Sequence, residues 1–305
     1  SPIDDTPADK AGIQAGDYIT HLNGDSVVDM NLKEAIDIMR GEVGTSITLT
    51  IIRGTEEPFD VELIRDTIKM ASVKHRVLND VGVLRVSTFN EQTTSGLKDS
   101  IQELEESENP PIGYVLDLRN NPGGLLTESV SVSDLFLEQG EIVSIRGREK
   151  KDVQVFSAKK GDLINQKPLV VLINEGSASA SEIVAGALQD HDRAVIMGMK
   201  SFGKGSVQTI VPIDSGAIRL TIAKYYTPSG DSIQAVGIEP DVVVPRAELN
   251  IIDNYFTFRE SDYQDALDNE TTDGSEEEAT STDILEKDYQ LSRAVDAVKT
   301  IAVLN

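Results

Sequence analysis

The chain has 305 residues, of which 39% are hydrophobic and 26% are charged, so it is long enough for two folded domains of ordinary composition. Its formal net charge of −24 excludes a general nucleic-acid binder, because phosphate binding requires a basic surface. The absence of cysteine excludes a disulfide framework, a thiol nucleophile and a thiolate metal site. No apolar run of about twenty residues is present that would cross a membrane.

Residues 1–66 have the pattern of a small β-rich domain. Residues 18–22 alternate as a strand, Asn23-Gly24 is a strong signal for a tight turn, and residues 46–52 alternate again. Between these strands, the apolar spacing over 31–40 predicts a helix. The chain opens without the basic and apolar stretches of a secretory signal, so we expect it to be part of a longer protein.

This first unit resembles a PDZ domain. The resemblance is carried by three short stretches, AGI at 11–13, GDYI at 16–19 and NG at 23–24. The strand, carboxylate-binding loop and edge strand with which a PDZ domain normally begins are missing, so we expect a PDZ domain that lacks its first strands. In the family, peptides pair with that edge strand. If the whole protein lacks it as well, we expect peptide capture to be crippled. The alternative is a small β-rich domain without a peptide role.

Residues 67–247 alternate between strands and helices, as in an α/β domain. Apolar runs at 81–86, 114–118 and 169–173 predict buried strands. The second strand is followed by the turn NNPGG and the third by GSASAS, and a helical pattern follows each turn. Such turns offer unpaired backbone N–H groups that would stabilise an alkoxide or an oxyanion. From spacing alone, NNPGG is best interpreted as a simple tight turn.

Three ordered blocks in this domain resemble the signature blocks of the C-terminal processing peptidases, also called tail-specific proteases. They are LDLRNNPGG at 116–124, GSASASE at 176–182 and FGKGSVQ at 202–208, with further matches in YYTPSG at 225–230 and GIEPD at 237–241. The resemblance extends from the PDZ unit to about Val244. It implies a crotonase-like α/β core joined to a PDZ domain. It also implies cleavage of protein or peptide substrates near apolar C-termini by a Ser-Lys mechanism, without metal or cofactor.

Carried over residue by residue, the resemblance makes Ser179 the nucleophile, Lys204 the general base and Gln208 the residue that orients the lysine amine. The backbone N–H groups of Gly124 and Ala180 would form the oxyanion hole. These five residues are the predicted catalytic site.

The predicted base must lose its charge to act. A free lysine has a pKa near 10.4, about three units too high for a base at neutral pH. Burial in an apolar pocket lowers it by that much. Phe202 and the flanking Gly203 and Gly205 allow such burial, so we expect Lys204 to be buried, with Gln208 holding the neutral amine.

Other residues offer alternative nucleophiles or motifs. Ser177 and Ser181 have the right residue type, but only Ser179 occupies the family position. Residues 201–204 spell the S-x-x-K motif of β-lactamases, and residues 198–204 nearly spell a phosphate-binding P-loop. Both motifs require a helix where a strand is predicted here.

The three histidines are weaker candidates. A Ser-His-Asp triad would use His191, which lies in a polar turn typical of a solvated surface. Asp190, in the same turn, is a candidate structural hydrogen-bond acceptor near the site. His21 and His75 stand alone in the sequence, so we expect no metal site.

Residues 260–282 are acidic and poor in apolar side chains, which predicts a solvated linker within 248–282. Residues 283–305 have the spacing of an amphipathic helix. This helix either packs on the protease core or forms a dimer contact.

The resemblance implies a periplasmic or otherwise extracytoplasmic location, and it leaves room for a homodimer or higher oligomer and for an activating adaptor. The competing functions are a non-catalytic PDZ and crotonase-like peptide-binding scaffold, and acyl-thioester chemistry on the same core.

Overall fold

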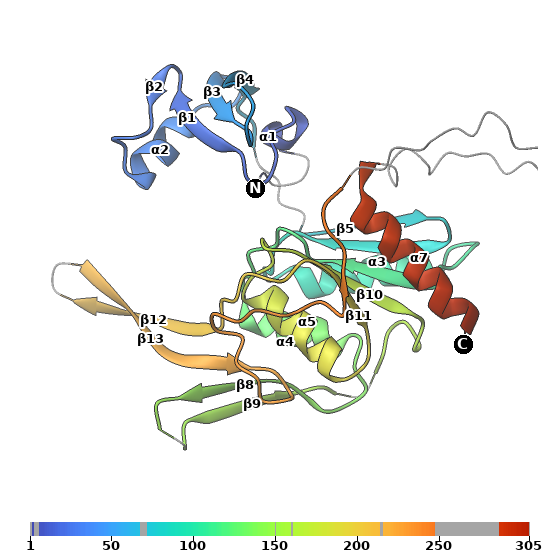
Figure 1. The fold of residues 1–305 in the computed structure, drawn as a ribbon. Helices are drawn as coiled ribbons and strands as arrows, with labels where there is room; N and C mark the ends of the chain where they lie inside the picture. Colours follow the sequence, from blue (N-terminus) through green and yellow to red (C-terminus); the bar gives the residue numbers. More distant parts are fainter. Residues whose placement is uncertain are drawn as a thin grey trace, which may run out of the picture.

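The computed structural model describes residues 2, 6–67, 72–149, 151–159, 161–213, 216–247 and 287–304. The predicted acidic linker at 248–282 lies outside these residues. Three sheets organise the described part of the chain (Figure 1). Within it, no helix is both long enough and apolar enough to span a membrane.

The N-terminal unit is a small domain around a four-stranded antiparallel sheet with the order β2-β1-β3-β4. Its elements are α1 (Pro7–Lys10), β1 (Tyr18–Leu22), β2 (Asp25–Ser26), α2 (Leu32–Met39), β3 (Ser46–Ile52) and β4 (Phe59–Ile64). The predicted turn at Asn23-Gly24 joins β1 to β2, with both residues at positive φ. Alternate residues of β3 are buried, as the period of two predicts. The helix α2 begins with a capping box between Asn31 and Glu34, but none of its residues is fully buried.

The second unit is built on a six-stranded sheet with the order β14-β11-β10-β7-β6-β5. Its strands are β5 (Val73–Leu78), β6 (Val81–Val86), β7 (Gly113–Asp117), β10 (Leu169–Ile173), β11 (Val195–Gly198) and β14 (Val242–Val243). Only the β5–β6 pair is antiparallel. Every residue of β7 and β10 is buried, which agrees with the continuous apolar runs in the sequence.

Helices cover both faces of this sheet. On one face lie α3 (Thr93–Glu105), α4 (Leu126–Asp134) and α5 (Ala180–Asp190), and on the other lies α7 (Tyr289–Leu304) (Figure 1). The side chains of each central strand divide between the two cores with a period of two: Leu116 packs with the first three helices, and its neighbour Val115 packs with α7. The parallel strands are therefore enclosed from both sides, which confirms the predicted α/β core.

The C-terminal helix α7 packs on its own chain. Leu291, Ala294, Val295 and Val298 are buried against β6, β7, β10 and β11. These four residues are thus covered within the chain, whereas Val303 and Leu304 at the end of the helix are exposed. A dimer contact stays a prediction.

A third sheet extends from the core, with the order β12-β13-β8-β9. Its strands are β8 (Glu141–Gly147), β9 (Val153–Ser157), β12 (Ser206–Ile213) and β13 (Gly216–Tyr226). The long hairpin of β12 and β13 projects away from the helices (Figure 1). Because β12 begins at Ser206, this sheet is joined directly to the loop that carries Lys204.

Candidate active site

Ser179 occupies the turn between the buried strand β10 and the helix α5. It is the N-cap residue of α5, with φ of 57° and ψ of −109°. This conformation is strained for a residue with a Cβ atom and is often found at functional sites. The side chain is half-buried. Ser179 therefore lies at the positive end of the helix dipole, in a held conformation that still leaves the residue accessible.

The two neighbouring serines have structural roles. Ser177 and Ser181 are both completely buried. Their hydroxyl groups donate to the backbone oxygens of Leu118 and Asn121, at 2.8 Å and 2.9 Å. These bonds join the turn after β10 to the turn after β7. Of the three serines in the block, Ser179 alone is accessible to a substrate.

The two turns lie directly against each other. A methyl group added to Gly123 would lie 2.6 Å from the oxygen of Ala178, 2.8 Å from Cβ of Ser179 and 2.9 Å from the nitrogen of Ala180. The Ala178 N–H also donates to the oxygen of Asn121, at 2.9 Å. This contact between the turns is what a shared oxyanion hole requires.

The predicted oxyanion donors are consistent with this arrangement. Within the described residues, neither the Gly124 N–H nor the Ala180 N–H donates a hydrogen bond to the protein. Gly124 is fixed at φ of 152°, and a methyl group there would lie 2.0 Å from the oxygen of Phe89. The tight contact holds the Gly124 amide in place. Because neither N–H group has an acceptor among the described residues, both amides are available to an oxyanion.

Replacing Gly123 by alanine is expected to separate the two turns. The added methyl group overlaps three atoms of the Ser179 turn, so we expect the free energy of unfolding to fall by about 3 kcal/mol and activity to fall with it. The matched control is Gly44→Ala, because Gly44 has a similar φ of 87° but no atom within 4 Å of the added group. Urea denaturation and a proteolysis assay compare the two variants. Equal losses in both would mean that backbone strain, and not contact between the turns, explains the effect.

A buried carboxylate connects the nucleophile to the lysine loop. Glu182, on the first turn of α5, is completely buried. Its Oε2 accepts from the N–H groups of Ser179 and Lys204, at 2.7 Å and 2.9 Å. Its Oε1 accepts from the Ser201 hydroxyl and the Gly203 N–H, both at 2.6 Å. Four donors converge on one side chain, which fixes the backbones of Ser179 and Lys204 relative to each other.

Sequence reasoning missed this role of Glu182. The signal was present, because a serine followed three residues later by glutamate is the pattern of a capping box. The Ser179 N–H does donate to Glu182 as that motif requires. What the motif does not predict is that the same carboxylate also binds a loop about twenty residues further along the chain.

The side chain of Lys204 does not lie where the sequence analysis expected it. Lys204 is exposed, and the exposed fraction of Phe202 is 68%. The loop is anchored through its backbone, with Gly203 and Gly205 buried, and its longer side chains face solvent. The expectation of a buried lysine is therefore wrong for this structure.

Gln208 is also exposed, and it lies on β12. Its amide nitrogen is 3.5 Å from the hydroxyl of Thr221 on β13, which is a long contact. In the described part of the chain, no hydrogen bond joins Gln208 to the amine of Lys204. The proposed roles of both residues remain predictions.

The alternative motifs do not form their required structures. Ser201 is buried, donates to Glu182 and accepts from the Ile238 N–H at 2.6 Å, so it is not free to attack a substrate. The segment from 201 to 205 is irregular, and β12 follows it. Neither an S-x-x-K site nor a P-loop is present at these residues.

His191 and Asp190 lie at the far end of α5 from Ser179. The eleven residues of that helix span about 16 Å. His191 contacts the oxygen of Glu141 at 2.7 Å, and Asp190 accepts from the Ser229 N–H at 2.8 Å. A Ser-His-Asp triad with Ser179 is excluded by this separation. Asp190 is a structural acceptor, as predicted, but it is not near the site.

The remaining histidines have local partners. His21 contacts the hydroxyl of Thr20 at 3.0 Å, and His75 contacts the hydroxyl of Ser100 at 3.1 Å. Among the residues that the structure describes, no three histidine or acidic side chains gather in a group that would hold a metal ion.

Comparison with known proteins identifies the family. A model of the peptidase family S41 matches residues 80–244, which is more than half of the chain. The chain belongs to peptidase family S41. A PDZ domain model matches residues 1–53. The S41 match covers every strand of the six-stranded sheet except β5, both turns of the candidate site and the Lys204 loop. These matches confirm an α/β S41 core with an N-terminal PDZ domain.

Curated relatives of this S41 chain are named as proteases. It is 58% identical over 248 residues to a carboxy-terminal-processing protease of Bartonella bacilliformis, a match that covers 80% of this chain and 57% of the relative. It is 40% identical over 268 residues to a CtpA-like serine protease of Staphylococcus epidermidis, covering 86% of this chain and 54% of the relative. The chain thus spans about half the length of the curated relatives that it matches.

Solved structures agree with this assignment. The S41 chain resembles the photosystem II D1 C-terminal processing protease with a TM-score of 0.67 and 32% identity, over 80% of this chain and 67% of the other. An S41 protease from Bacteroides fragilis shares the fold at 20% identity, with a TM-score of 0.54 over 80% of this chain and 69% of the other.

Proposed function

We propose that this S41 chain is a serine endopeptidase in which Ser179 is the nucleophile and Lys204 the general base. The observation that carries the proposal is the arrangement around Ser179. This accessible and strained serine faces the Gly123-Gly124 turn, and the carboxylate of Glu182 binds both its backbone and that of the lysine loop. The lineage of the chain supports the same reaction, because its relatives are named as proteases.

In the proposed reaction each of these groups has one role. The Ser179 hydroxyl attacks the carbonyl carbon of the scissile bond while its proton passes to the amine of Lys204. The resulting oxyanion accepts hydrogen bonds from the N–H groups of Gly124 and Ala180. Lys204 then gives the proton to the leaving amine, which breaks the peptide bond and leaves an ester on Ser179. Water, deprotonated by Lys204, hydrolyses this ester and restores the serine.

This mechanism requires an uncharged lysine amine close to Ser179. Lys204 is exposed in the structure. We propose that a bound polypeptide covers the loop at 201–205 and removes water from the amine. Catalytic hydrogen bonds often form only in the complex with substrate, so the exposed side chain is compatible with the role.

We propose polypeptides with apolar C-terminal segments as the substrates. The proposal is supported by the family resemblance and by the relatives named for carboxy-terminal processing. A surface that suits such segments is present: Ile218, Leu220 and Ile222 of β13 are about half exposed, on the hairpin joined to the lysine loop. An extracytoplasmic location is proposed on the resemblance alone, and cell fractionation would test it.

The test is hydrolysis of an unfolded protein with an apolar C-terminus, followed from pH 6 to 10 with the chain and with Lys204→Met. We expect the variant to lose at least about 10³-fold in kcat, because the proton of Ser179 then has no acceptor. Equal cleavage by both proteins would show that Lys204 is not the base.

The same assay tests the alternative of a peptide-binding scaffold, which the exposure of Lys204 and Gln208 favours. Binding of the apolar peptide by the parent chain and by the variant, with no cleavage by either, would support the scaffold. Cleavage that depends on Lys204 excludes it.

A further inference from the structure

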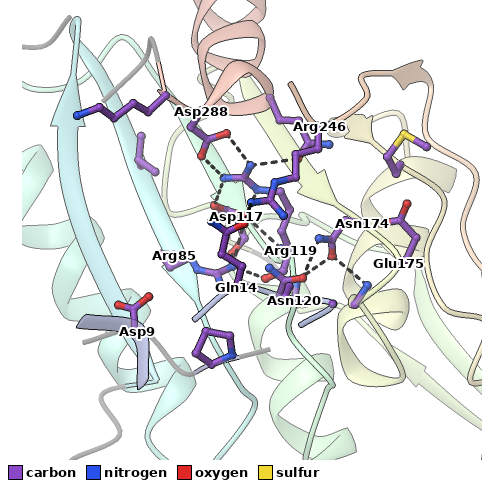
Figure 2. Close-up of a pocket in the computed structure, with 18 of the residues that line it drawn as sticks. Asp9, Gln14, Arg85, Asp117, Arg119, Asn120, Asn174, Glu175, Arg246 and Asp288 are labelled. Atoms are coloured by element: carbon purple, nitrogen blue, oxygen red, sulfur yellow. Dashed lines mark hydrogen bonds and ion pairs between the residues drawn. The ribbon is translucent and has the colours of Figure 1, made fainter. Parts of the chain in front are cut away.

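Arg119 joins the C-terminal helix to the turn that carries the predicted oxyanion donor. It follows β7 by two residues and precedes Gly124 by five. Its guanidinium binds two carboxylates at once. It donates to the oxygens of Asp117 at 2.9 Å and 2.8 Å, and to those of Asp288 at 2.8 Å and 2.7 Å (Figure 2). Asp288 is separated from Arg119 by 169 residues of sequence.

The charges in this group are strongly coupled. Burial alone would raise the pKa of the Asp117 carboxyl, but the positive charges of Arg119 and Arg85 and the hydrogen bonds from Arg119 hold that pKa well below its usual range. Burial likewise opposes the charged form of Arg119, yet the charge of Asp117 and the bonds to Asp288 and Asp117 raise its pKa. Asp117 and Arg119 therefore each stabilise the charged form of the other, and the geometry of the group depends on all its partners.

On the helix side, Asp288 and Gln290 fix the start of α7. One oxygen of Asp288 also accepts from the Leu291 N–H at 3.1 Å, as an N-cap residue does. Gln290 accepts from Arg119 at 3.2 Å and donates to the oxygen of Val244 at 2.7 Å. The docked end of the helix and Asp117 together thus fix the orientation of the guanidinium.

On the site side, the residue after Arg119 connects the two catalytic turns. The Asn120 N–H donates to the side-chain oxygen of Asn174 at 2.7 Å, and the Asn174 amide donates back to the side-chain oxygen of Asn120 at 2.9 Å (Figure 2). Asn174 also accepts from the Gly176 N–H at 3.0 Å, and its own N–H donates to the Ser177 hydroxyl. Hydrogen bonds on either side of the peptide link between Arg119 and Asn120 therefore connect Asp288 to the turn that holds Ser179.

This set of bonds faces a cavity of about 1110 Å³ that lies between the PDZ unit and the core. Asp117, Arg119, Asn120, Asn174 and Asp288 all line it, whereas Ser179 and Lys204 do not. The network therefore contacts the catalytic turns without lining the same cavity as Ser179 or Lys204. It can affect catalysis only through the position of the turns.

We propose that docking of the N-terminus of α7 positions the oxyanion turn, and that Arg119 and Asp288 are the positioning residues that transmit it. This inference rests on the proposed function. Loss of the Asp288 charge would weaken the two-point bond that ties Arg119 to the start of α7 and leave its bonds to Asp117 and Gln290, so the segment 119–124 would become less well held. Because an oxyanion hole acts on the transition state, the effect is expected in kcat and not in KM.

The test compares Asp288→Asn with Asp296→Asn in the 305-residue chain. Asparagine caps a helix as well as aspartate, so the first variant keeps α7 while losing the charged fork to Arg119. Asp296 lies on the same helix, is exposed and pairs with Arg293 only at 3.3 Å, so the control makes the same charge change away from the network. We expect Asp288→Asn to lower kcat about tenfold with KM unchanged, and Asp296→Asn to leave both unchanged. Asp288→Glu should restore part of the loss.

Hydrogen exchange separates the failure of this inference from failure of the proposed function. The N–H groups of Asn120, Asn121 and Gly123 are hydrogen-bonded, and Asp288→Asn should speed their exchange relative to the control. If Asp288→Asn speeds exchange of these N–H groups but the parent chain cleaves no substrate, the coupling of α7 to the turn stands and the protease function is rejected. Unchanged exchange, or an active chain in which Asp288→Asn leaves kcat unchanged, would overturn the inference.

Discussion

Replacing Ser179 by alanine is expected to lower kcat/KM for an unfolded protein substrate by about 10⁴-fold or more. Without the hydroxyl group no acyl-enzyme forms, and only the oxyanion donors and substrate binding contribute to the residual rate. The fold should survive, because the Ser179 contact to Glu182 is made by the backbone N–H. Cleavage is measured by the appearance of new termini in a mass spectrum of the products.

The matched variant is Ser179→Gly, which is equally inactive by this account. It should be more stable than Ser179→Ala by about 1 kcal/mol, because glycine adopts a φ of 57° with less strain. Urea denaturation of the two variants measures this difference. An alanine variant that still cleaves would remove Ser179 from the mechanism. A glycine variant that is the less stable of the two would show that the turn is not strained.

The second large effect is expected for Glu182→Gln. Each of the two carboxylate oxygens accepts two hydrogen bonds. Glutamine has an NH2 group in place of one oxygen, so in either orientation of the amide this NH2 group faces two donors and cannot accept from them. The side chain is completely buried, and water cannot replace the lost bonds. We expect the free energy of unfolding to fall by about 3 kcal/mol and kcat to fall about 100-fold as Ser179 and Lys204 lose their common support.

Glu175→Gln is the control for this change. Glu175 lies in the same turn but is exposed, so the same substitution removes a charge without breaking the set of four bonds. Stability is measured by urea denaturation and activity by the same proteolysis assay. If Glu182→Gln matched the control in both, the carboxylate would be only one of several supports for the two segments.

Much of the core could be predicted because local patterns determine it. The strands β7 and β10 are read from continuous apolar runs, and the turns after them from glycine, proline and serine. The amphipathic spacing of α7 predicts a helix and its apolar face. It does not predict which surface that face covers, since the core sheet and a second chain offer the same chemistry. In the structure the buried residues of this face pack on the sheet.

The parts of the site that the sequence did not predict depend on long-range contacts. Burial of Lys204 was inferred from its neighbours, but exposure depends on what packs over the loop, and in this structure its backbone alone is held. The pairing of Arg119 with Asp288 joins residues far apart in a chain with many acids, and no local pattern selects one of them.

The central claim is that Ser179 is activated by Lys204, and covalent labelling tests it most directly. The chain would be treated at pH 8 with a fluorophosphonate, which reacts with activated serine hydroxyl groups, and the adduct located by mass spectrometry of its peptides. We predict a single adduct on Ser179 and a labelling rate that is about 100-fold lower in Lys204→Met. An adduct on Ser177, Ser181 or Ser201, or an equal labelling rate in the lysine variant, would contradict the account.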